Sequence, residues 1–188
     1  NFSYMSKENI QRCLPTLSYA PVVGHLIDKL DEDGNPTGEK YMGGHDYYID
    51  NDLDGFGNWF NIQAQEERDH AMLFVKYLQN NGVKVELKAI DKPDKEFTSF
   101  IAPLEVSYEH EQYVTSLIHN IYDVAYTVKD FRTMQFLDWF IKEQGEEETN
   151  ADGLIKKYKL FGSDPKSLYL LNQELAGRVY AAPSLVLD

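Results

Sequence analysis

The chain has 188 residues, of which 43% are hydrophobic and 26% charged, and its formal net charge is −13. This composition is typical of one folded domain rather than of a disordered chain. The negative charge argues against nucleic acid as a partner, because phosphates would be repelled. No apolar run is long enough to span a bilayer, no signal peptide is visible, and the single cysteine excludes an intrachain disulfide. We therefore expect no membrane association and favour a cytoplasmic protein, although secretion stays open.

The first part of the chain, residues 1–51, shows no clear periodicity. Pro15 and Pro21 would interrupt a helix there. Residues 31–38 have the composition of a turn, so residues 25–41 are compatible with a small hairpin. We expect this segment to diverge from the rest of the domain.

From about residue 52 onward the pattern is strongly helical, because apolar residues recur at three- and four-residue steps. Gly82 after two asparagines is a good stop for the first helix, and Pro103 suits the first turn of the second. The long connection between them could carry the chain across the length of a bundle. The predicted helices cover about 52–81, 103–128, 131–160 and 165–176, followed by an extended tail.

Three of these helices each place an acidic residue on an apolar face. Glu67 stands seven residues from Phe60 and from Phe74, almost two helical turns, so all three point the same way. Glu111 and Glu147 occupy equivalent positions on the next two helices. A buried ionised carboxylate is costly unless it is paired or binds metal, and several together cannot all be ionised without a cation.

Two further side chains lie one helical turn from these acids. His70 follows Glu67 at the Glu-x-x-His spacing found in di-metal bundles, and Gln144 precedes Glu147. Oxygen ligands with one imidazole suit iron or manganese. Alone, either motif would more often be incidental, and a structural bundle with protonated acids remains an alternative. The conjunction on three successive helices favours a metal site.

The same residues resemble a known family. The segments that carry the resemblance to bacterial non-haem ferritins are 52–56, 59–60, 65–71, 108–112, 136–140, 143–148, 168–171 and 174–175. The resemblance covers about 52–183 and implies an all-α, ferritin-like four-helix bundle with a short fifth helix. We therefore expect a single domain, residues 1–188, whose first helix is remodelled or interrupted.

The resemblance also implies a role for each acid. Glu67 would bridge two irons, and His70 would bind the first of them. Glu111 and Glu147 would bind the second iron, with Gln144 beside it. A third iron site, which shares Glu147, would be formed by Glu66, Glu143 and Glu146, and the neighbouring aromatic residue is Trp139.

The function implied is iron storage. Fe(II) would be oxidised by dioxygen or peroxide, and ferric mineral would be kept in a homo-oligomeric shell of 24 subunits. Haem is not expected, because the position of the haem-binding methionine of bacterioferritins is Arg68 here. Asn150, three residues after Glu147, replaces the second histidine of bacterioferritins and rubrerythrins, which again favours ferritins.

One expected ligand is missing. Ferritins supply a first-helix glutamate to the first iron, and counting at the family spacing reaches Gly34 or Pro21 instead. The candidates to replace it are Glu32, Glu39, His25 and Asp46, while Tyr41 falls where the family has a tyrosine. The alternative function is therefore a ferritin-like shell or a ligand- or partner-binding protein with a degenerate ferroxidase site.

Overall fold

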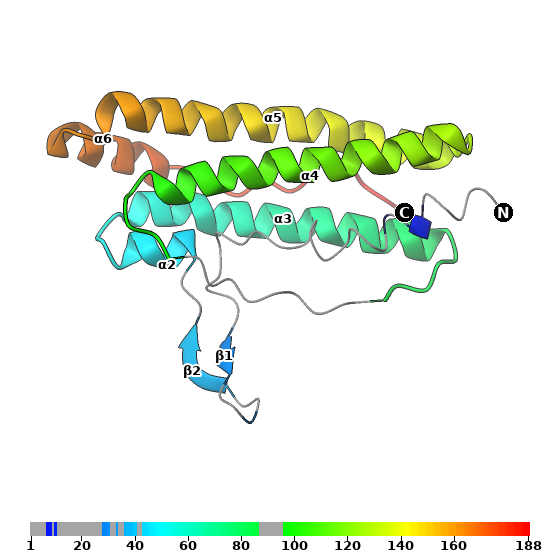
Figure 1. Ribbon diagram of the computed structural model, residues 1–188, viewed down its shortest axis with the longest axis horizontal. Coiled ribbons are helices and arrows are strands. Elements are labelled where there is room, and N and C mark those ends of the chain that lie inside the picture. Colours follow the sequence, from blue (N-terminus) through cyan, green and yellow to red (C-terminus); the bar gives the residue numbers. More distant parts are fainter. Residues whose placement is uncertain are drawn as a thin grey trace.

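The computed structural model describes residues 7, 8, 10, 28–30, 33, 36–40, 43–86 and 96–188. Within them, the elements in chain order are β1 (Asp28–Leu30), β2 (Pro36–Lys40), α2 (Gly44–Ile49), α3 (Asp54–Asn80), α4 (Ala102–Thr127), α5 (Phe131–Phe161) and α6 (Pro165–Ala176). The three long helices lie side by side, and α6 covers one end of the bundle (Figure 1). The predicted helical bundle with a short last helix is confirmed, with a small hairpin added to it.

The ends of the long helices follow local chemistry. α3 is followed by Gly82 at φ +70, a conformation that costs glycine little. Pro103 lies in the first turn of α4. Asp130 caps α5 by accepting a hydrogen bond from the Thr133 amide at 3.2 Å, and Asp164 caps α6 in the same way. Each predicted boundary after residue 51 lies within two residues of the observed one.

The start of α3 is joined to α6 by one buried side chain. The Asn172 Oδ1 atom accepts hydrogen bonds from the Gly55 amide at 2.8 Å and from the Phe56 amide at 3.2 Å. These are donors that the first turn of a helix leaves unpaired. A Cβ atom at Gly55 would lie 1.8 Å from the Asn172 carbonyl oxygen, so only glycine permits this approach. The contact fixes α6 against the bundle.

The apolar core is divided into two clusters. One, around Phe56, Phe60 and Leu104, lies at the end of the bundle covered by α6. The other, around Phe74 and Phe140, lies toward the opposite end of α3. The residues between the two clusters are buried as well, but they are polar, and they form the site described below.

Three of these elements, β1, β2 and α2, lie within residues 1–51. β1 and β2 are antiparallel, with Asp28 opposite Lys40, and fall inside the segment considered for a hairpin. α2 was not expected. It is placed by Tyr48, which is fully buried, stacks on Phe56 and Phe60 at 5.0 and 5.5 Å between centroids, and donates to the Phe100 carbonyl. In the described part of the chain, no helix combines the length and apolar character needed to cross a membrane.

Candidate metal centre

A layer of buried polar side chains separates the two apolar clusters. Its exposed fractions are only 5% for Glu67 and His70, 2% for Glu111 and Gln144, and 7% for Glu147. α3, α4 and α5 each contribute to it. The structure therefore brings together inside the bundle the five side chains whose inward direction follows from helical periodicity.

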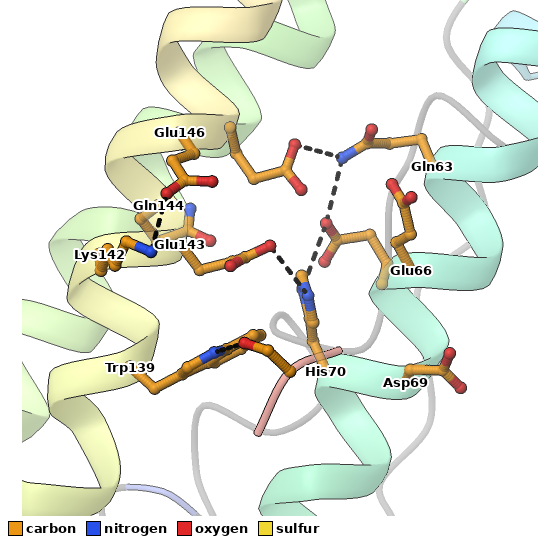
Figure 2. A network of polar contacts seen from close by, with 12 residues as sticks. Gln63, Glu66, Asp69, His70, Trp139, Lys142, Glu143, Gln144 and Glu146 are labelled. Atoms are coloured by element: carbon orange, nitrogen blue, oxygen red, sulfur yellow. Dashed lines mark hydrogen bonds and ion pairs between the residues drawn. The ribbon is translucent and has the colours of Figure 1, made fainter. Parts of the chain in front are cut away.

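An amide from α3 links two of the acids. The Gln63 Nε2 atom donates to Glu147 Oε2 at 2.9 Å and to Glu67 Oε1 at 3.4 Å (Figure 2). The two carboxylates thus share one donor across the gap between α3 and α5. Gln63 is 1% exposed and was not singled out from the sequence, although it lies one turn before Glu67 on the same face. The periodicity that places Glu67 inward could have found it.

A second amide holds the acid of α4. The Gln144 Nε2 atom lies 3.3 Å from Glu111 Oε2 and 3.2 Å from the Glu111 carbonyl oxygen, and donates to both. This contact ties α5 to α4 at the level of the site. It places the Gln144 amide beside the Glu111 carboxylate, while the expected place of Gln144 next to a second iron stays a prediction.

The imidazole of His70 lies between acids from two helices. Its Nδ1 atom is 3.8 Å from Glu67 Oε1, and its Nε2 atom is 4.0 Å from Glu143 Oε1 (Figure 2). The ring stands edge-on to Trp139, with 5.5 Å between centroids, and also contacts Phe140. Burial disfavours the imidazolium, but Glu67, Glu147 and Glu143 outweigh it and raise the pKa of His70 above its ordinary value.

Burial and mutual repulsion favour protonation of the central acids. Burial, with Glu67 and Glu147 nearby, raises the pKa of Glu111 well above its ordinary value. Burial and Glu67 raise the pKa of Glu147 to about 7, against the opposing effect of the Gln63 hydrogen bond. In the absence of a cation, protons must therefore supply part of the positive charge that this layer needs.

A pocket of about 260 Å³ lies beside the layer, between α3 and α5. Its acidic lining contains Glu66, Glu143, Glu146 and Glu147, so the structure brings the residues expected at a third iron site to one cavity. His70 also lines this pocket and connects it to the buried layer. The rest of the wall is formed by Trp139 and Asn150 of α5 and by Arg178 and residues 181–184 of the C-terminal tail.

The donor types suit iron, but the side chains are not preassembled around one point. Among the described residues, no three His, Cys, Asp or Glu side chains are grouped closely enough to hold one ion. Like charges repel, and the amides of Gln63 and Gln144 draw Glu147 and Glu111 toward themselves. Each amide contacts one oxygen of its carboxylate, so a bound cation would take the other oxygen while the amide keeps the group oriented.

Most candidates for the missing first-helix ligand are not among the residues that the structure describes. Glu32, His25 and Tyr41 lie outside the described residues, as do Gly34, Pro21 and Pro15. Glu39 lies in β2, and its side chain is likewise outside the described part. Asp46 is described: its carboxylate lies 2.7 Å from His45 Nδ1 on α2.

Comparison with known proteins gives a consistent result. The model of the ferritin-like domain of the ferritin family matches residues 38–161. A bacterial non-heme ferritin from Campylobacter jejuni is 37% identical over 133 residues, which cover 71% of this chain and 80% of that protein. Another, from Staphylococcus aureus, is 33% identical over 162 residues, or 83% of this chain and 96% of that protein. The crystal structure of an open-pore ferritin from Archaeoglobus fulgidus is similar with a TM-score of 0.81 at 31% identity, covering 95% of this chain and 100% of that one.

Proposed function

Since the chain belongs to the ferritin family, we propose that it oxidises Fe(II) at a carboxylate-bridged di-iron site and stores the ferric product within a shell of its own copies. The observation that carries this proposal is the buried layer of Glu67, His70, Glu111 and Glu147 between two apolar clusters. So much buried acid is unfavourable unless cations or protons balance it. Iron as substrate supplies that balance.

The proposed roles are those that the resemblance to ferritins implies, and the positions of the side chains are compatible with them. Glu67 lies between the imidazole of His70 and the amide shared with Glu147, so it can bridge two irons. His70 binds the first iron, while Glu111 and Glu147 bind the second. Two adjacent Fe(II) ions allow dioxygen to take one electron from each, and carboxylates stabilise the Fe(III) that forms.

Gln144 keeps the Glu111 carboxylate directed into the layer. Protons leave the acids as the cations enter, because the two compete for the same oxygen atoms. The neighbouring pocket, with Glu66, Glu143 and Glu146, would take further iron on its way to the mineral. No haem is needed for these steps.

The surface supports assembly into a closed homo-oligomer, for which we propose 24 subunits. Large apolar side chains are exposed where α5 ends and along α6: 74% for Leu160, 49% for Phe161, and 60% each for Tyr169 and Leu170. Exposed apolar patches of this kind mark protein interfaces. Contacts between copies would cover them.

Iron-soaked crystals test the site directly. Anomalous scattering at the iron edge should show peaks within bonding distance of Glu67, Glu111 and Glu147. The Glu67→Gln variant should lose or weaken them. A map without a peak near Glu67 at high iron occupancy would overturn the proposal.

A second candidate function is a ferritin-like shell or ligand- or partner-binding protein that oxidises iron slowly or not at all. It is favoured by one observation: within the described residues, only Glu67 and His70 occupy the positions expected for the first iron. The rate of Fe(II) oxidation separates the two functions, because only a complete di-iron site oxidises Fe(II) rapidly.

A further inference from the structure

The last residues of the chain, 177–188, form a strap across the acidic pocket. From α6 they run back along the bundle toward the end of α3 (Figure 1), where the Asn80 side chain donates to the Asp188 carbonyl at 2.8 Å. Midway, Trp139 Nε1 donates to Ser184 Oγ at 2.8 Å, and the Tyr180 hydroxyl donates to Asp69. Residues 181–184 line the pocket itself. The strap is therefore the wall that closes this side of the acidic pocket.

The strap inserts one positive charge beside the acids. The Arg178 guanidinium pairs with Glu66 and donates to Gln63 Oε1 from both terminal nitrogens, at 3.1 Å each. It also donates to the Trp59 carbonyl at 3.3 Å and lies 5.0 Å from the centre of that ring. Arg178 thus binds three side chains of α3 on consecutive turns.

The contact with Gln63 extends to the buried layer. Its Oε1 atom accepts from Arg178, while its Nε2 atom donates to Glu147 and Glu67. One amide therefore connects the strap to two acids of the proposed di-iron site. Its orientation is fixed from both sides, because a flipped amide would face the guanidinium with its own donors.

We propose that Arg178 is a built-in counter-cation of the acidic pocket, and that a divalent cation entering the pocket displaces it and loosens the strap. The inference rests on the proposed function only in taking Fe(II) as the natural cation. A guanidinium bound to Glu66 uses the oxygen that a metal ion would need, and two cations at the same carboxylate repel each other. Binding of one must weaken binding of the other.

Few apolar contacts hold the strap against the bundle. Leu185 and Leu187 pack against the apolar cluster of Phe74 and Phe140, but Val179 and Val186 are each 80% exposed. Its remaining described anchors are mainly polar contacts at the surface. Loss of the Arg178 contacts would loosen the wall that residues 181–184 contribute, so iron loading and opening of the pocket would be coupled.

The test uses zinc, a divalent cation without redox chemistry, on the full-length assembled protein. Binding is measured by calorimetry, and mobility of the strap by hydrogen exchange of the peptide 178–188. In the wild-type protein, zinc should increase exchange of this peptide. Arg178→Gln should bind zinc in the pocket about tenfold more tightly, since a charge-assisted contact no longer competes. Arg178→Lys should lie between the two.

Two variants serve as controls. Glu146→Gln, which removes a pocket acid that does not contact Arg178, should shift both zinc binding and strap release to higher zinc concentration. Tyr180→Phe removes the contact with Asp69 without changing charge in the pocket. It should raise exchange of the strap before zinc is added. Because strap release and zinc binding are coupled, it should also raise zinc affinity, but by less than Arg178→Gln does, since Arg178 still pairs with Glu66.

The inference is wrong if Arg178→Gln binds zinc no more tightly than the wild-type protein. It is also wrong if saturating zinc leaves exchange of the strap unchanged. In either case, zinc binding that still depends on Glu67 and Glu111 would leave the proposed function standing. If zinc binds neither in the acidic pocket nor in the buried layer, both the inference and the proposed function are overturned.

Discussion

Glu147 shows, at the scale of one residue, how the metal-free site is balanced. It is buried, it faces Glu67 across a shared amide, and it borders the acidic pocket. Its pKa of about 7 means that the folded protein holds a proton there that the unfolded chain, with an ordinary carboxyl pKa, gives up near pH 4.5. A metal ion bound at this carboxylate, as proposed, would therefore compete with this proton near neutral pH.

The first prediction is that Glu147→Gln stabilises the metal-free protein, and more so at higher pH. Between about pH 4.5 and pH 7 the folded state binds more protons than the unfolded state, so the contribution of Glu147 to the free energy of unfolding falls as pH rises. Glutamine does not titrate. The free energy of unfolding of the variant, relative to that of the wild-type protein, should rise by on the order of 2–3 kcal/mol between pH 5 and pH 8. Thermal unfolding in chelator measures it. Glu146→Gln, at a side chain 58% exposed, is the control, and an equal gain at both pH values would contradict the prediction.

The second prediction concerns Gln63. Gln63→Leu removes the donor shared by Glu67 and Glu147 and the acceptor for Arg178. Losses of groups that orient ligands typically reduce metal affinity or activity by about 10–100-fold. We expect a reduction of this size in zinc affinity at the buried layer. Gln65→Leu, at an exposed position two residues away, should have little effect; equal effects would show that Gln63 orients nothing.

At the scale of elements, the sequence predicts most of the bundle because residues near the helix ends carry local start and stop signals. Gly82, Pro103 and the caps Asp130 and Asp164 act within one turn, so no tertiary contact is needed to find them. The inward acids follow in the same way from helical periodicity. These features are local, and the family resemblance through residue 183 agrees with them.

What the sequence misses depends on contacts between distant segments. α2 has six residues, too few for a periodic pattern, and it is held by the packing of Tyr48 on α3. The strap has no secondary structure to predict, and Arg178 meets Glu66 across 112 positions of sequence. Gln63 is a neutral amide on an apolar face. Burial of an ionised acid at such a position predicts a metal ion or a partner, whereas burial of an amide does not.

The third prediction tests the junction of α3 and α6. Gly55→Ala would place a Cβ atom 1.8 Å from the Asn172 carbonyl oxygen, so α6 must move and its cap on α3 must weaken. We expect a loss of about 1–3 kcal/mol in stability, as for other overpacked positions. Gly153→Ala in α5, where nothing lies within 4 Å of the added atom, should instead stabilise by roughly 0.5–1 kcal/mol. Chemical denaturation compares the free energies of unfolding of the two variants. Equal changes in stability would contradict the close contact at Gly55.

At the scale of the whole molecule, the exposed apolar side chains of α5 and α6 carry the fourth prediction. Leu170→Lys puts a charge into the patch that we propose is covered by neighbouring copies, and should shift the protein toward smaller species in light scattering. Val186→Lys, at the 80% exposed position on the strap, should leave the assembly unchanged. A wild-type protein that is monomeric at micromolar concentration would leave the shell proposal without support.

The last prediction concerns the rate of the proposed reaction, which depends on residues from both ends of the chain. Among the described residues, the proposed first iron site contains His70 and the bridging Glu67, and the sequence has Gly34 or Pro21 where the family's first-helix glutamate would stand. One missing ligand should slow Fe(II) oxidation by about 10–100-fold relative to a ferritin with a complete site. Some oxidation should remain, because the pocket acids still bind iron.

Stopped-flow absorbance after aerobic addition of Fe(II) measures this rate. A slow phase that is insensitive to His70→Ala would agree with the incomplete first site. A fast phase that saturates at roughly two irons per subunit and disappears in His70→Ala would contradict it, since such behaviour requires two complete, adjacent sites. The ligand would then be an acid within residues 1–51. Glu32→Gln and Glu39→Gln, tested separately, should identify it, because only the variant that loses the true ligand would lose the fast phase.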